Sequence, residues 1–452
     1  MKKFLLICFI LLSWAFVRGQ HVLNGTVSGL ANEKVSLWQT FGNDRQLIDT
    51  SFLNEQGSFR FEMEPRLPAG MYRVMTESGI GFDLIYNREN IQLIVIINEY
   101  DKYVQVMESV ENMIYYDFVN LKQKNLLKLD ILGPIVEYYP KNDPFYQDVV
   151  NKVQEFKKEL SERAGKLTAN NPETMASHFI SVENPVFSPA GLSEEEQKEF
   201  LKVHFFDHID FSDTVLLKSS LLNSRMINYL SLYQDRNADK ETFENSLLQG
   251  VDTLLEKAMI NQEMYEYVVD FLLEGFEAVG FEGGLAYISE HNNLDEFCTN
   301  TEKLVELQNK MELINRLAIG RQAPDFTGVT IEGDTIRLRD ISADRILLFF
   351  WASWCPHCKN VVSDINDIDL NYSEEEIKII GVSVDTSLQD VKDVISSYHI
   401  SWPNIAEGKG WEGEISESYG IAATPTMYLL DENKKIIAKP INKRDLQKAL
   451  GY

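Results

Sequence analysis

The chain has 452 residues, of which 44% are hydrophobic and 25% are charged. These fractions are close to those of globular proteins and exclude a disordered, collagen-like or coiled-coil chain, and the length predicts about three domains at roughly 150 residues each. Lys and Arg number 43 against 69 Asp and Glu, which gives a formal net charge of −26. Such an acidic chain repels phosphate backbones and anionic lipid surfaces, so we expect no nucleic-acid partner.

The first 19 residues have the pattern of a secretory signal peptide. Lys2 and Lys3 precede an apolar run over residues 4–12, and a small residue, Gly19, follows near a plausible cleavage point. The run is shorter than the ~20 residues that span a bilayer, so we expect no integral membrane span in the mature chain. Cys8 lies inside the run and would be removed with it. The pattern predicts a periplasmic or secreted protein; an uncleaved segment that holds the protein at the membrane is the alternative.

Residues 20–108 alternate between apolar and polar side chains over short stretches separated by turn residues. This pattern is typical of β-strands that bury one face. The expected strands cover residues 22–27, 34–38, 46–52, 57–63, 70–75 and 91–97. Several strands at this spacing predict an N-terminal antiparallel β-sandwich domain.

Residues 109–318 change to helical spacing. The expected helices cover residues 115–129, 145–167, 194–206, 215–233, 241–259 and 264–278. Ser193, which is followed by three glutamates, and Asp239 are suitable caps for two of them. No internal repeat is strong enough to indicate a solenoid, although helical hairpins of this size could stack in that way. We predict an all-α domain over this range.

Strands and helices alternate from residue 319 to residue 452. A hairpin is expected around Gly333 and Asp334, followed by a buried strand over 345–351, a helix that begins at the Cys355–Cys358 segment, a strand over 377–384 and a helix over 388–398. A second hairpin over 427–438 and a helix over 443–450 complete the chain. This order predicts an α/β domain with a mixed sheet flanked by helices.

The sequence Cys355-Pro356-His357-Cys358 stands where that buried strand gives way to a helix. Two cysteines in a first helical turn can form a disulfide, and the amides at the helix start favour a thiolate on the first cysteine. We expect this first cysteine, Cys355, to be exposed and to face those amides. Pro suits the first helical position because its missing N–H would have no partner there. His357 adds a donor and, when protonated, a positive charge beside the sulfur. The pattern therefore predicts a redox-active dithiol.

Metal binding and a structural disulfide are the simpler alternatives for these cysteines. A structural zinc needs four ligands, and no second Cys or His pair follows the first. A disulfide that closes so short a loop gains little chain entropy. His204 and His208, with Asp207 and Asp210, could bind a metal, but two histidines one helical turn apart are more often partly exposed surface residues. We expect neither a metal nor a cofactor, and we expect Cys298 to be a buried, inert thiol.

Three segments together resemble the thioredoxin superfamily, specifically the extracytoplasmic TlpA/ResA-like thiol-disulfide oxidoreductases. They are Phe350-Trp-Ala-Ser-Trp-Cys-Pro-His-Cys-Lys, residues 320–326 and Ala423-Thr-Pro-Thr. The resemblance covers residues 319–452, and the β-rich N-terminal part is similar to a module often found before such domains. The resemblance to the oxidoreductases implies that Pro425 follows a cis peptide bond beside the dithiol and that Thr424 contacts the substrate. We also expect the rings of Trp351 and Trp354 to pack around the active-site turn.

Two residues depart from this family's pattern. The strand below the dithiol carries Phe349 where thioredoxins have an acid, and Val361 stands where TlpA/ResA-like members often have Glu. The usual proton acceptor for Cys358 is therefore missing, and we expect Asp364 and Asp385 to cap helices or face solvent. The Cys-Pro-His-Cys sequence is also that of the strong oxidant DsbA, so the resemblance leaves open whether the couple reduces or oxidises its partners.

The sequence thus predicts a thiol-disulfide oxidoreductase in which Cys355 attacks and Cys358 resolves the mixed disulfide, supported by Trp354, Pro356, His357, Thr424 and Pro425. Its expected partners are protein thiols or disulfides of the cell envelope and an electron donor or acceptor. One alternative is a peroxiredoxin-like peroxidase, because the segment Ala323-Pro324-Asp325-Phe326 is shared with that group. The other is an envelope binding protein in which the dithiol only regulates attachment.

Overall fold

The computed structural model describes residues 21–42, 44–97, 102–189, 191–234, 240–291 and 302–451. The chain forms two compact units, Met1–Gln234 and Asp235–Tyr452. The predicted signal segment and Cys298 lie outside the described residues. Among the helices of the described ranges, none has both the length and the apolar character that crossing a bilayer requires.

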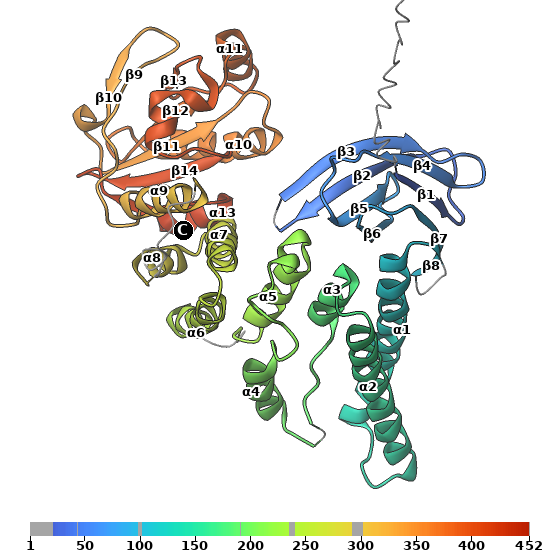
Figure 1. Ribbon diagram of the computed structural model, residues 1–452. Helices are drawn as coiled ribbons and strands as arrows, with labels where there is room; N and C mark the ends of the chain where they lie inside the picture. Colours follow the sequence, from blue (N-terminus) through green and yellow to red (C-terminus); the bar gives the residue numbers. More distant parts are fainter. Residues whose placement is uncertain are drawn as a thin grey trace, which may run out of the picture. The chain divides into compact units, whose positions relative to one another are not determined.

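Two four-stranded sheets form the N-terminal part of the first unit (Figure 1). One sheet has the order β4-β1-β7-β8 and the other β3-β2-β5-β6. Inward-facing residues of the strands other than β3 form a shared core, as Phe59 and Phe61 of β4 and Leu37 of β2 do. The strands are β1 His21–Val27, β2 Lys34–Phe41, β3 Asp44–Phe52, β4 Ser58–Met63, β5 Gly70–Thr76, β6 Gly81–Tyr86, β7 Ile91–Ile97 and β8 Lys102–Glu108.

The prediction of an entirely antiparallel sandwich was wrong at one pair of strands. β1 pairs with β7 in parallel, with Leu23 opposite Ile91 and Val27 opposite Val95, whereas the other pairs in both sheets are antiparallel. A parallel pair needs a long connection, and five strands lie between β1 and β7 in the chain. Alternation of apolar residues shows which face of a strand is buried but not its direction. The strands β6 and β8 were not predicted.

The rest of the first unit is helical, as predicted. The helices are α1 Val110–Tyr138, α2 Pro144–Asn170, α3 Met175–Glu183, α4 Glu194–His204, the 3₁₀ helix η1 Thr214–Lys218 and α5 Leu221–Ser231. Ser193 and Glu196 form a reciprocal cap at the start of α4. The segment predicted as one helix over 215–233 breaks at Ser219, whose hydroxyl bonds to Leu216 O and accepts from Leu221 N. Such local side-chain bonds compete with helix continuation.

In its described residues, the second unit begins with the helices α6 to α9 and ends in an α/β domain (Figure 1). The helices are α6 Lys240–Ala258, α7 Gln262–Val279, α8 Glu282–His291 and α9 Glu302–Arg316. The α/β domain contains the hairpin β9 Thr327–Val329 and β10 Thr335–Arg337, then β11 Arg345–Trp351, α10 Pro356–Asn371, β12 Ile377–Ser383, α11 Leu388–Ser397, β13 Asn404–Ala406, α12 Glu414–Ser418, β14 Thr426–Asp431, β15 Ile436–Ala438 and α13 Lys443–Leu450. Two 3₁₀ turns, η3 Leu338–Asp340 and η4 Gly410–Glu412, lie between these elements.

A five-stranded mixed sheet forms the centre of this domain, in the order β13-β12-β11-β14-β15. β11 is parallel to β12 and antiparallel to β14, and β14 is antiparallel to β15. Val362 of α10, Val391 of α11 and Leu446 of α13 share one core with the sheet. The predicted α/β fold with a mixed sheet and flanking helices is confirmed.

The helical region that we predicted as one domain is divided between the two units. α1–α5 belong to the first unit and α6–α9 to the second. In the second unit, Leu317 is part of the core of the α/β domain and Leu313 packs against it. These contacts join residues that are distant in the sequence, and helical periodicity does not show which surface a helix will cover.

Candidate functional site

The dithiol lies at the start of α10, directly after the central strand β11. Cys355 is the N-cap of this helix and Pro356 occupies its first turn. The sulfur of Cys355 accepts a hydrogen bond from the backbone N–H of Cys358 at 3.1 Å, and the two cysteines form a disulfide. The helix start thus places a free backbone donor on the first sulfur, as the sequence predicted.

Both cysteines are buried, which corrects part of the sequence interpretation. Cys355 is 3% exposed and Cys358 is fully buried. We expected Cys355 to be exposed as well as facing the helix amides, but neighbouring residues cover it. Pro356 and His357 between the two cysteines are exposed. The distinction between the two sulfurs therefore depends on the N-cap position of Cys355 and not on a large difference in exposure.

The loop before β14 borders the sulfur of Cys355. The Thr424–Pro425 peptide bond is cis, as the resemblance implies. The carbonyl oxygen of Thr424 lies 3.4 Å from Cys355 Sγ, and Thr424 and Pro425 are both partly exposed. The structure therefore brings together the dithiol and the loop, which are far apart in the sequence.

The two tryptophans near the dithiol have different environments. Trp354 is 58% exposed and contacts Trp411 edge to face, with ring centroids 6.0 Å apart. Trp351 is buried, and its Nε1–H donates to Asn404 Oδ1 at 3.0 Å. Trp354 thus lies on the surface beside Cys355, whereas Trp351 belongs to the core beneath the active-site turn.

Asp385 has a role that the sequence analysis missed. We expected it to cap a helix or face solvent, but it is 2% exposed. Its carboxylate accepts from the N–H of Ser353 at 2.8 Å, from the hydroxyl of Ser353 at 2.6 Å and from the hydroxyl of Ser383 at 2.8 Å. Ser353 belongs to the short connection between β11 and Cys355, so Asp385 fixes the turn that presents the dithiol.

A signal for Asp385 was present in the sequence. β11 and β12 are parallel, with Trp351 opposite Ser383 at their carboxyl ends. The dithiol follows β11 and Asp385 follows β12, so the two connections meet at the same edge of the sheet. Functional side chains of open α/β sheets commonly lie at this edge.

The other acidic and apolar positions near the dithiol have simpler environments. Phe349 is fully buried in β11, opposite Gly381 and Met427 on the neighbouring strands. Val361 is partly buried and packs against the core of the domain. Asp364 forms an ion pair with Lys443 of α13, and this hydrogen bond raises the pKa of Lys443.

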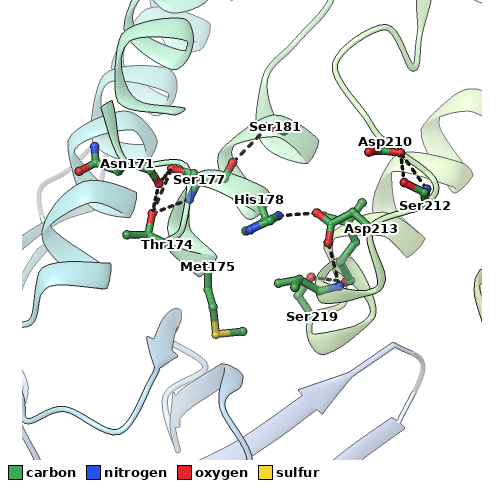
Figure 2. Close-up of polar contacts among 12 residues, drawn as sticks. Asn171, Thr174, Met175, Ser177, His178, Ser181, Asp210, Ser212, Asp213 and Ser219 are labelled. Carbon is green, nitrogen blue, oxygen red and sulfur yellow. Dashed lines mark hydrogen bonds and ion pairs between the residues drawn. The ribbon is translucent and has the colours of Figure 1, made fainter. Parts of the chain in front are cut away.

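His204 and His208 have different surroundings. His204 stacks on Phe200 and contacts Asp207 on the surface, with Nδ1 2.8 Å from Oδ2. His208 lines a cavity of about 460 Å³ with His178 and Asp213. Figure 2 shows His178 of α3 paired with Asp213, whose carboxylate also accepts from Val215 N. Among the described residues, no group of three His, Cys, Asp or Glu side chains could hold a metal ion.

Two family models match parts of the chain. The AhpC/TSA family matches residues 319–439, which include the dithiol and the cis-proline loop. A domain of unknown function, DUF5106, matches residues 152–274, from α2 to α7.

Known proteins with related sequences or folds match mainly the C-terminal part. The thiol-disulfide oxidoreductase ResA of Bacillus thuringiensis subsp. konkukian (strain 97-27) is 33% identical over 122 residues, which are 27% of this chain and 69% of ResA. The thioredoxin domain of a thiol-disulfide oxidoreductase of Bacteroides vulgatus is 28% identical, with 30% of this chain and 96% of that chain covered and a TM-score of 0.28. A thioredoxin-like protein of Bacteroides caccae ATCC 43185 is 17% identical, with 59% and 96% covered and a TM-score of 0.43.

The mixed sheet, the Cys-X-X-Cys sequence at a helix start and the cis-proline loop define a thioredoxin-like redox domain. The chain belongs to the family of ResA-like thiol-disulfide oxidoreductases.

Proposed function

We propose that Cys355 and Cys358 are the redox couple through which this oxidoreductase exchanges disulfides with other proteins. The observation that carries this proposal is the position of Cys355, which caps α10, accepts the amide of Cys358 at 3.1 Å and is bonded to the Cys358 sulfur. In the reduced protein, the same amide and the helix dipole stabilise a thiolate on Cys355. The neighbouring groups Trp354, Pro356, His357, Thr424 and Pro425 shape the surface that meets a partner.

The reductive direction has two balanced steps. The Cys355 thiolate attacks one sulfur of a substrate disulfide, which forms a mixed disulfide and releases the other substrate sulfur as a thiolate that takes up a proton. Cys358 then loses its proton and attacks Cys355, which forms the Cys355–Cys358 disulfide and releases the second substrate thiol. Two electrons pass from the dithiol to the substrate, and the oxidative direction is the reverse. The two sulfurs supply all of this chemistry, so no metal or organic cofactor takes part.

We place the protein in the cell envelope, where its partners are protein thiols or disulfides and a separate electron donor or acceptor. The support for this location is the pattern of residues 1–19, with two lysines before an apolar run. The compartment also suits the chemistry, because disulfides form and persist in oxidising surroundings.

Alkylation of the reduced full chain tests the assignment of the two cysteines. We expect iodoacetamide to modify Cys355 much faster than Cys358 below neutral pH, as measured by mass spectrometry of proteolytic fragments, because only Cys355 has the helix-start donor. Faster modification of Cys358 would reverse the assignment. The Cys298→Ser variant is the matched control, because it removes a third thiol and leaves the dithiol intact.

The Cys355→Ser, Cys358→Ser double variant separates exchange from binding. An exchange enzyme loses its turnover of protein disulfides, whereas a binding protein keeps its partner in a pull-down experiment. A direct assay with hydrogen peroxide tests peroxidase activity. We expect consumption of peroxide by the reduced protein to be slow compared with its exchange with protein disulfides.

A further inference from the structure

The sheet β3-β2-β5-β6 (Figure 1) has a groove on the face that points away from the core of the β-sandwich. Along β2, Val35 and Leu37 are buried in the shared core, and the alternate residues Ser36 and Trp38 lie on the other face. The groove has a volume of about 580 Å³, which is within the range of small-molecule sites. We call it the sheet groove; it includes Ser36, Trp38, Arg45, Arg73, Met75 and Gly81.

The strand register places an arginine on either side of Trp38. Arg73 of β5 lies directly opposite Trp38 of β2. On the other side of β2, the β3 residues Leu47 and Arg45 lie opposite Trp38 and Thr40. Side chains opposite each other on one face of a sheet are neighbours, with Cβ atoms about 5 Å apart. The aromatic ring is therefore bordered by a guanidinium on each neighbouring strand.

Trp38 and Met75 give the sheet groove an apolar floor. The Nε1–H of Trp38 donates to Ser36 Oγ at 2.8 Å, and the Ser36 hydroxyl donates to Met75 O at 3.1 Å. The one polar hydrogen of the indole is thus used within the sheet, and its bond to a residue two positions earlier holds the ring along β2. Met75 packs closely over Gly81, because a Cβ atom at position 81 would lie 2.4 Å from Met75 Sδ. This floor offers an apolar contact surface rather than hydrogen bonds.

Neither guanidinium of the sheet groove donates a hydrogen bond to a residue that the structure describes. Arg73 Nε lies 3.2 Å from Asp83 Oδ1, but its N–H is not hydrogen-bonded. Arg45 is exposed and has no ion pair within the described ranges. Both side chains therefore keep their planar sets of N–H donors for a ligand. Guanidinium groups bind carboxylates and phosphates through such paired donors.

The electrostatic field of the sheet groove favours an anion. Burial and the charge of Glu183 raise the pKa of Asp83. The charges of Arg73, Lys102 and Arg45 lower it, so three cations act on this one position. Lys102 reaches the groove from β8, where its Nζ donates to a backbone carbonyl at the start of β6. The groove is thus locally positive on a chain whose net charge is −26.

We propose that the sheet groove binds a small aromatic carboxylate, with its ring against Trp38 and its carboxylate held by Arg45 and Arg73. The apolar floor suits a planar apolar group, and the guanidinium donors suit a carboxylate. A sugar acid or an inorganic anion satisfies only the second requirement, because the hydroxyls of Ser36 and Thr40 already donate to backbone carbonyls. The site lies in the first unit, and its binding does not involve the dithiol.

Isothermal titration calorimetry with the full chain tests this proposal. The probes are naphthylacetate, its uncharged amide naphthylacetamide, glucuronate and inorganic phosphate. We expect naphthylacetate to bind about tenfold more tightly than each of the others, or better. The amide lacks the charge-assisted hydrogen bonds, and glucuronate and phosphate lack the apolar ring that the floor would remove from water.

Three variants separate the two parts of the sheet groove. Arg45→Gln, at an exposed position, should weaken the binding of naphthylacetate about tenfold and leave that of naphthylacetamide unchanged. Arg60→Gln, at an exposed position of β4 in the other sheet, is the matched control and should change neither affinity. Trp38→Leu should weaken both naphthyl probes, because it removes the planar surface. The Cys355→Ser, Cys358→Ser variant should bind as the wild type does.

Equal affinities for naphthylacetate and naphthylacetamide, or equal effects of Arg45→Gln and Arg60→Gln, would overturn the proposal. Binding of glucuronate or phosphate as tight as that of naphthylacetate would also overturn it, because the groove would then be a general anion site. The same holds if naphthylacetate fails to bind at millimolar concentration. If Trp38→Leu does not fold, the comparison of the two arginine variants decides alone.

Discussion

Replacement of Asp385 by Ala should loosen the turn that carries the dithiol. The carboxylate accepts three hydrogen bonds, two from Ser353 and one from Ser383, and the residue is 2% exposed. A hydrogen bond to a charged group contributes about 1.5–3 kcal/mol, which gives an upper bound of roughly 5–9 kcal/mol for three. Alanine also removes the cost of burying a charge, and water can enter the space. We therefore expect a loss of about 3 kcal/mol in the free energy of opening this turn.

Replacement of Asp385 by Asn should lower the free energy of opening this turn by less than replacement by Ala does. Both Ser353 N and the Ser383 hydroxyl bond to the same oxygen, Oδ2, and the Ser353 hydroxyl bonds to Oδ1. The amide oxygen of Asn can accept the first two bonds, and its NH₂ group can donate to the Ser353 hydroxyl. All three contacts are kept without the charge, so we expect a loss of about 1 kcal/mol.

Hydrogen exchange measured by mass spectrometry checks these values in the full chain. A loss of 3 kcal/mol corresponds to about 100-fold faster exchange of the Ser353 amide, and 1 kcal/mol to about fivefold. Asp393→Ala, at an exposed position of α11, is the matched control. Peptides from β14, in the same α/β domain, report any unfolding of the whole domain. If the Ser353 amide exchanged at the same rate in wild type and Asp385→Ala, the carboxylate would not hold the turn.

Three further predictions concern the second unit, His208 and the redox couple. A fragment of residues 319–452 should fold, as circular dichroism would show, but a fragment of 240–452 should melt roughly 5–10 °C higher because it retains Leu313 and Leu317. Partial desolvation is the largest cause that lowers the pKa of His208, and the positive charge of Arg225 lowers it further. The negative charge of Asp207 raises it, but by less. The unfolded chain therefore binds the proton more readily, so thermal stability should fall as the pH drops below about 6.5, and less steeply in His208→Gln; equal slopes would contradict this. The Cys355/Cys358 couple should be more oxidising than that of thioredoxin, which is roughly −270 mV, and His357→Pro should make it more reducing. A titration against glutathione measures both potentials. A wild-type potential below that of thioredoxin, or no shift in the variant, would refute this.

The sequence was sufficient to predict the elements whose signals are local. Cys355 and Pro356 mark a helix start. Cys355 can accept a backbone N–H of the first turn, and Pro356 lacks the N–H that would have no partner there, so this signal does not depend on the rest of the fold. The alternation of Phe59, Phe61 and Met63 predicts a strand with one buried face for a similarly local reason. The motif around the dithiol and the Thr424–Pro425 segment then identified the thioredoxin-like domain, and the structure brings these two segments together.

The features that were missed depend on contacts between distant residues. The parallel direction of β1 and β7 is set by the path of the chain between them. The attachment of α9 to the α/β domain depends on which apolar surface Leu313 covers. Asp385 resembles a surface acid in its local sequence, and only the neighbouring connection, with Ser353, makes it a buried acceptor. Local periodicity does not contain this information.

The arrangement of Asp385 also bears on how the exchange is supported. In this chain Phe349 and Val361 occupy the positions where an acid was expected from the family pattern, and both pack in or against the core. Asp385 does not simply replace that acid, because the serine donors already occupy both of its oxygens. We therefore expect the carboxylate to act on the backbone of the turn rather than to remove the proton of Cys358. In the reductive direction, the substrate sulfur released from the mixed disulfide can accept that proton, because it leaves as a thiolate. Stabilisation of the Cys355 thiolate then depends on the Cys358 amide and the helix start, which the Asp385 network holds in place.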